Sequence, residues 1–242
     1  SFTGRRPRSD WWDAQFERSD FDEREMAQEA DIDFVGSGKP FVSADIVDRW
    51  IEKKAKPPLM WGELHVHSDT QEATWSGQEL EATSNFKLWI ELDIESMTPA
   101  HGTYIVSADI AAGSGGSSSS KSALVIYDAI LRRQVGRYSV RGVDPRTFAR
   151  FSVGVCKFFH DAILAPEING PGASFVKEAQ RIGYWNIIQR EQQMEIGAAL
   201  TRKLGVVNQD RGTDLIGALR TAISRGEVEI YDEDVFREIG MY

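Results

Sequence analysis

Tyr104-Ile-Val-Ser-Ala-Asp109-Ile-Ala-Ala-Gly113, a bend rich in Ser and Gly, and Lys121-Ser-Ala-Leu-Val-Ile-Tyr-Asp128 form the stretch around which the chain is organised. Its two apolar segments are rich in β-branched and aromatic residues, which predicts two strands joined by a turn. The first strand ends on one acid, Asp109. A carboxylate that a strand delivers into a glycine-rich turn can hold a divalent cation, with room left for water and a phosphodiester. The same pattern fits a solvated strand end, so a second carboxylate is needed to decide.

Short strands and helices alternate after this stretch. A helix is predicted to begin at Asp144-Pro145, because Asp is a favoured N-cap and Pro a favoured first helical residue. The apolar segment that follows this helix ends on an acid, Glu167, just before Gly170-Pro-Gly172 breaks the chain. The predicted strands are 103–109, 122–130, 134–141, 162–167 and 185–189; the predicted helices are 144–160, 173–182 and 214–224, with an extended segment at 227–231.

The element order β-β-β-α-β-α-β predicts an α/β protein with a ribonuclease H-like mixed sheet flanked by helices. In that topology the first strand lies beside the strand that follows the first helix. Asp109 and Glu167 are therefore expected at the same end of the sheet. This convergence favours a metal site over a solvated strand end.

The N-terminal part of the chain is less regular. Residues 1–54 predict a small helical and irregular segment, in which Ser43 caps a helix over Ala44–Lys54. Residues 55–87 are polar and predict a linker, and residues 87–94 alternate in part and predict an edge strand.

Two histidines in this linker are a weak metal-site candidate. His65 and His67 flank Val66, an alternation that puts both imidazoles on one side of a strand. They fit either a metal pair or an exposed strand or linker, and no third ligand is obvious nearby.

Composition limits the class of protein and its partners. The 242 residues are 41% hydrophobic, enough for one large core or two small ones, and no apolar segment approaches the ~20 residues that span a membrane. The single cysteine, Cys156, excludes an internal disulfide and a cysteine-based zinc cluster, and it favours a reducing, intracellular setting.

The net charge of −9 is unevenly distributed. Up to residue 100 there are 11 Lys and Arg against 21 Asp and Glu, and after it 17 against 16. Polyanion binding is therefore expected only in the second half, with an ordinary solvated surface as the alternative. The DNA-binding candidates are Arg132, Arg133 and Arg146.

The second half resembles the nuclease domain of the large terminase subunit of tailed bacteriophages. The resemblance spans roughly residues 88–242, and the start of the chain, around residues 28–38, resembles the segment that closes the ATPase domain of that family. The segments that carry it, in the order of the family, are Ser107-Ala-Asp109-Ile-Ala-Ala-Gly113, Val143-Asp-Pro-Arg-Thr-Phe148, Pro166-Glu167-Ile-Asn169-Gly170-Pro-Gly172, Gly183-Tyr-Trp-Asn-Ile-Ile188 and Asp214-Leu-Ile216.

The resemblance implies three parts and an activity. Residues 1–54 would be the end of an ATPase domain, 55–87 a linker and 88–242 the nuclease domain; the chain contains no G-x-x-x-x-G-K-[ST] motif and so no ATPase activity of its own is expected. Hydrolysis of DNA would use two Mg²⁺ or Mn²⁺ ions, bridged by Asp109, with Glu167 on one of them. The supporting residues would be Asn169, Gly113 and Lys121, with Lys121 also readable as a solvated lysine.

The metal site needs a third acid in this reading. In the family it usually lies beyond the segment that corresponds to Asp232–Glu238, so it is expected after Tyr242, where the domain would continue. The candidates inside the chain are Asp234 and Asp210, whereas Asp232 is best explained as a helix cap.

Partners and location also follow from the resemblance. Double-stranded DNA is the expected substrate, and the portal protein and the small terminase subunit are the expected protein partners. The chain would be oligomeric in the packaging motor and monomeric alone, in the host cytoplasm and transiently at the procapsid portal. The alternatives are a part of the motor that grips DNA without cutting it, or another ribonuclease H-like enzyme such as a junction resolvase or transposase.

Overall fold

The computed structural model describes residues 42–78, 84–113, 120–192, 201–206 and 215–241. The chain forms two compact units. The larger comprises residues 54–233, and the smaller joins the part before residue 54 to residues 234–242. Of the predictions above, those on residues 1–41 and on Asp210 lie outside the described residues.

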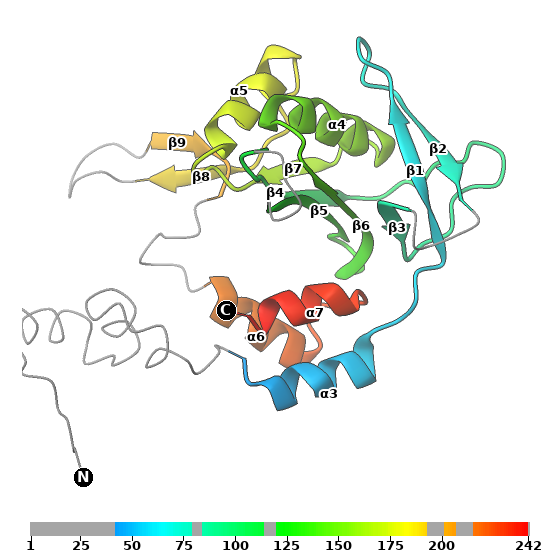
Figure 1. Ribbon diagram of the computed structural model, residues 1–242, viewed down its shortest axis with the longest axis vertical. Helices are drawn as coiled ribbons and strands as arrows, with labels where there is room; N and C mark the ends of the chain where they lie inside the picture. Colours follow the sequence, from blue (N-terminus) through cyan, green and yellow to red (C-terminus); the bar gives the residue numbers. More distant parts are fainter. Residues whose placement is uncertain (1–41, 79–83, 114–119, 193–200, 207–214, 242) are drawn as a thin grey trace, which may run out of the picture. The chain divides into compact units, whose positions relative to one another are not determined.

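The larger unit is built on one seven-stranded mixed sheet with the order β2-β1-β3-β6-β5-β4-β7 (Figure 1). β4, β5 and β6 are antiparallel neighbours, and β7 pairs with β4 in parallel after the crossover through α4. This arrangement confirms the predicted ribonuclease H-like mixed sheet. The strands of the sheet are β1 (Met60–Val66), β2 (Ala73–Gly77), β3 (Phe86–Leu88), β4 (Tyr104–Asp109), β5 (Lys121–Asp128), β6 (Arg133–Arg141) and β7 (Ile163–Pro166).

Two helices, α4 (Pro145–Phe158) and α5 (Gly172–Arg181), pack together over one face of this sheet (Figure 1). The N-terminus of α4 is fixed as predicted, since the Asp144 carboxylate accepts from the backbone N–H groups of Arg146 and Thr147. Between the helices and the sheet lies an apolar core that includes Val106, Leu124, Ile126, Phe148, Val155, Phe159, Leu164 and Phe175, all fully or almost fully buried.

The expected linker is instead part of the sheet. β1 and β2 form a hairpin within residues 55–87, in which Leu64 pairs with Trp75 and both side chains are buried. The predicted strand over 87–94 is also different, because β3 has only three residues and lies between β1 and β6 rather than at an edge. Pairing with long neighbours explains a strand too short to be seen from its own alternation.

The remaining elements of the larger unit show one further difference from the prediction. Residues 185–189 contribute only a bridge from Ile187 to Leu164, and the strand itself begins at the end of that segment. It belongs to a separate two-stranded sheet. These elements are β8 (Gln189–Gln192), β9 (Thr201–Leu204) and helix α6 (Leu215–Arg225), the last close to its predicted bounds.

The smaller unit contains α3 (Ala44–Lys54) and α7 (Glu233–Ile239). Helix α3 has the predicted bounds, and the Ser43 carbonyl accepts from the N–H groups of its first turn. Trp50 of α3 stacks at a tilt on Phe236 of α7, with ring centroids 6.0 Å apart. No helix in the described ranges is long and apolar enough to cross a membrane.

Candidate active site

Asp109 and Glu167 lie at the same end of the sheet, as the sequence predicts. In the parallel pair β4–β7 the residues before them, Ala108 and Pro166, are register partners. The backbone N–H of Glu167 donates to the Ala108 carbonyl at 2.9 Å and continues the ladder past the end of β7. Side chains two positions apart lie on the same face of a strand. Asp109 therefore lies on the face of Ser107 and Glu167 on the face of Ala165, the face opposite to that of the buried Val106 and Ala108.

The Asp109 carboxyl is in an environment that disfavours its charge. Although the residue is exposed, neighbouring protein atoms partly desolvate the carboxyl and raise its pKa, and the N–H of Ile110 opposes this shift. Among the described residues no Lys or Arg forms an ion pair with it. Binding of a cation to such a carboxylate is favourable, because the cation stabilises its charged form.

Glu167 is held by its own loop. The Asn169 side chain donates from Nδ2 to Glu167 Oε1 at 3.0 Å. Asn169, a supporting residue in the sequence interpretation, thus contacts Glu167 directly. It restrains one carboxylate oxygen and leaves the other available.

Two glycines allow the chain to fold tightly around the acids. Gly113 has φ +73, and a Cβ there would lie 2.7 Å from the Val143 carbonyl oxygen, so the loop after β4 packs against the start of α4 only with glycine. A Cβ on Gly172 would lie 1.9 Å from the carbonyl oxygen of Glu167, so the first residue of α5 rests on the backbone of the acid. The Ser122 hydroxyl also accepts from the N–H of Ala111 and fixes the turn after Asp109.

The predicted basic residues fall at different ends of the sheet. Lys121 begins β5 and shares the face of Ala123, the register partner of Asp109, so it lies at the acid end. Arg132 and Arg133 are at the turn between β5 and β6, at the opposite end. Arg146 is in the first turn of α4, which starts at the acid end directly after β6.

The structure does not bring a third acid to the pair within the described residues, where no group of three His, Cys, Asp or Glu side chains has the geometry to hold a metal. Asp232 is instead paired with Arg137, with 3.0 Å between Oδ2 and Nη1. It directly precedes α7, which fits the helix-cap position predicted for it. Asp234 is exposed and belongs to the other unit.

The histidine pair also finds no third ligand in the part of the chain that the structure describes. Both imidazoles are exposed, and His65 lies in β1. His67 Nδ1 accepts weakly from the N–H groups of Asp69 and Thr70, at 3.3 and 3.4 Å. These contacts occupy one ring nitrogen of His67 and are typical of a turn.

A cavity of about 650 Å³ between α4 and α5 was not predicted. Four cationic side chains and one carboxylate line it, together with the loop after β7. The signal was present in the sequence, because the cations form two pairs at i, i+4 spacing on the two helices. The lining residues are Arg146, Arg150, Gly170, Ala173, Ser174, Lys177, Glu178 and Arg181.

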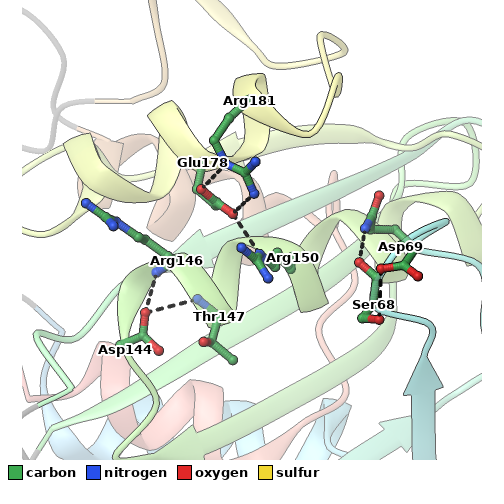
Figure 2. Close-up of polar contacts among 9 residues, drawn as sticks. Ser68, Asp69, Asp144, Arg146, Thr147, Arg150, Glu178 and Arg181 are labelled. Carbon is green, nitrogen blue, oxygen red and sulfur yellow. Dashed lines mark hydrogen bonds and ion pairs between the residues drawn. The ribbon is translucent and has the colours of Figure 1, made fainter.

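The carboxylate in this cavity is fully engaged (Figure 2). Glu178 Oε1 accepts from Arg150 at 2.7 Å and from Arg181 at 2.8 Å, and Oε2 accepts from Arg181 at 2.8 Å. The hydrogen bonds from Arg181, with those from Arg150, lower the pKa of Glu178 to about 2. The carboxylate therefore stays charged at neutral pH and fixes two of the four cations.

Comparison with known proteins gives a likeness of fold. No family model and no curated protein matches the sequence. The large terminase nuclease of thermophilic phage G20c with bound cobalt is 10% identical, with a TM-score of 0.48 over 80% of this chain and 78% of that one. The same nuclease with bound magnesium is 12% identical, with a TM-score of 0.45 over 65% and 70%.

A third solved structure, the large terminase nuclease domain of Thermus phage P74-26, is 13% identical, with a TM-score of 0.44 over 66% of this chain and 70% of that one. The three structures are described as large terminase nucleases. Identities of 10–13% and scores below 0.5 limit this likeness to the arrangement of strands and helices.

Proposed function

We propose that this chain is the nuclease part of a viral DNA-packaging terminase, a metal-dependent endonuclease that cuts concatemeric double-stranded DNA. The observation that carries the proposal is the position of Asp109 and Glu167, which follow register partners of adjacent parallel strands at one end of the sheet. The sequence motifs that resemble the terminase family include both acids.

The residues at this end suit a hard divalent cation. Both side chains offer oxygen ligands, which Mg²⁺ and Mn²⁺ prefer. Partial desolvation raises the pKa of Asp109, and a bound cation would offset this cost by stabilising the charged carboxylate. Two such ions would lower the pKa of an attacking water and stabilise the leaving oxygen of a phosphodiester.

The chain's own residues then have distinct tasks. Asp109 and Glu167 would hold the ions, and Asn169 restrains the Glu167 carboxylate through its 3.0 Å hydrogen bond. Lys121, at the same end of the sheet, would contact a phosphate oxygen. The portal protein and the small terminase subunit are the proposed partners, and the host cytoplasm and the procapsid portal the proposed locations.

Nicking of supercoiled plasmid with Mn²⁺ tests this function. Asp109→Asn should lose well over 100-fold of the rate, because even a change in the residues behind metal ligands costs about 10- to 100-fold. The matched control is Asp161→Asn, an exposed acid just before β7 and at the opposite end of that strand from Glu167, which should cut like the wild type. Equal rates for Asp109→Asn and the wild type, with both proteins folded, would refute the proposal.

A second candidate function is a part of the motor that grips DNA without cutting it. It is favoured by the absence of a third acid beside the pair among the described residues and by the cationic cavity at the same end of the sheet. Wild-type protein that binds duplex DNA but shows no metal-stimulated nicking would support this candidate instead.

A further inference from the structure

The cationic cavity between α4 and α5 has a composition suited to one kind of ligand. Arg146, Arg150, Lys177 and Arg181 line it, and a single carboxylate, Glu178, opposes them. Glu178 is already bonded to Arg150 and Arg181. Within the described residues neither Arg146 nor Lys177 forms an ion pair, and both are exposed. Two cations are thus fixed in place and two remain available to an anion.

Backbone groups reinforce this charge. Helix α5 has ten residues, no acidic residue in its first turn and no side-chain hydrogen bond at its N-cap, Pro171. The cavity is lined at that end by Gly170, Ala173 and Ser174. The Gly172 and Ser174 N–H groups already donate to the Asn169 and Pro171 carbonyls, so the contribution of this end to binding a phosphate is the positive end of the helix dipole. The chemistry of the cavity therefore matches an anion with several acceptor oxygens.

One end of the cavity follows the acid pair in the chain. Gly170 is three residues after Glu167, so their Cα atoms are at most about 11 Å apart. The start of α5 rests on the Glu167 carbonyl, as the close approach of Gly172 shows. The cations of the cavity lie further along α4 and α5, which cover the sheet face of Val106 and Ala108, whereas both acids follow the other face.

We propose, building on the nuclease function above, that the α4–α5 cavity binds a backbone phosphate of duplex DNA. Arg146 and Lys177 contact the phosphate. Glu178 keeps the Arg150 and Arg181 guanidinium groups aligned beside it (Figure 2). The contact is independent of sequence, because it involves no base edge.

The test separates binding from cutting. Binding of a fluorescent 30-base-pair duplex is measured by anisotropy in EDTA at several salt concentrations, and plasmid nicking is measured with Mn²⁺. Arg146→Gln/Lys177→Gln removes the contacts to one phosphate and should lower the salt slope by about 1, which at 0.15 M salt is an affinity loss on the order of 5-fold. Arg146→Lys/Lys177→Arg keeps both charges and should retain most of the affinity.

The control removes the same charge elsewhere. Lys53→Gln/Arg225→Gln changes two exposed cations that neither line the cavity nor belong to the DNA-binding candidates. It should leave the affinity within about threefold, since only contacting charges release counterions. Circular dichroism and thermal melting of each variant verify folding.

Each outcome of these measurements either supports or overturns the proposed phosphate site. Loss of affinity by Arg146→Gln/Lys177→Gln alone supports the cavity. An equal loss in the control, no loss in either variant, or no duplex binding by the wild type overturns it. If the wild type binds DNA through the cavity but does not nick it, the nuclease function is refuted and the phosphate site is supported. If the wild type nicks DNA and Arg146→Gln/Lys177→Gln binds it normally, the nuclease function is supported and the phosphate site is refuted.

Discussion

Replacing Asp232 by Ala should destabilise the fold without affecting metal binding. The Asp232 and Arg137 side chains are only 4% and 8% exposed, and their charged atoms are 3.0 Å apart. The backbone N–H groups of Tyr231 and Asp232 both donate to Gln134 Oε1 at 3.0 Å. The pair therefore sits where the segment before α7 is fastened to β6.

The magnitude follows from burial. At this distance and an effective dielectric constant of about 20 the attraction is about 5 kcal/mol, and much of it is offset by the cost of burying the two charges. Removing one partner keeps the cost and loses the attraction. We expect Asp232→Ala to lower the free energy of unfolding by about 3–5 kcal/mol, or the melting temperature by roughly 10 °C.

Urea unfolding and Mn²⁺ calorimetry measure the two effects. Asp234→Ala is the matched control, an exposed acid two residues later that should cost less than about 1 kcal/mol. Arg137→Met/Asp232→Leu should recover most of the loss, because a packed apolar pair replaces the buried charges. If Asp232→Ala weakened Mn²⁺ binding and left stability unchanged, Asp232 would be a metal ligand, and its ion pair with Arg137 would not stabilise the fold.

Two further predictions concern α5. The pKa of Glu178, about 2 against an ordinary 4.5, means that its ion pairs stabilise the fold above pH ~4.5 and that this stabilisation is lost as the pH falls toward 2. Arg150 and Arg181 are 47% and 60% exposed, so solvent screening reduces this stabilisation to about 1 kcal/mol. Glu178→Gln should therefore flatten the pH dependence of the melting temperature in this range. A pH dependence as steep as that of the wild type would contradict this prediction. Gly172→Ala should cost about 1–3 kcal/mol and slow nicking, because a Cβ 1.9 Å from the Glu167 carbonyl oxygen must displace that residue. Gly77→Ala, whose Cβ would have only an ordinary contact at 3.8 Å, is the control, and equal nicking by the two variants would show that Gly172 does not position Glu167.

Local signals in the sequence were enough to predict the centre of the fold. The alternating burial of β4 and the N-cap of α4 at Asp144 depend on neighbouring residues, so they are visible without the rest of the structure. The meeting of Asp109 and Glu167 then follows from the handedness and order of a single crossover.

Features that depend on distant partners were missed. β1 and β2 have polar residues and are held by pairs such as Leu64 with Trp75, and β3 exists because β1 and β6 lie on either side of it. The basic residues show the same limit. Arg132 and Arg146 are close in sequence, but the length of β6 places them at opposite ends of the sheet.

The acidic net charge does not conflict with DNA as the ligand. At physiological salt a charge is screened beyond about 8 Å, so the field in the α4–α5 cavity depends on the charges near it and not on the net charge of −9. The four cations that line the cavity act at contact distance, where screening is weak. Asp109 and Glu167, by contrast, repel a phosphate unless cations neutralise them. The two features are therefore complementary: the cavity gives a phosphate a place to bind away from a carboxylate pair that would otherwise reject it, and divalent cations at the pair remove the remaining repulsion. The net charge of the whole chain combines the cationic cavity and the acidic residues into one number, so it cannot predict which ligand binds at either site.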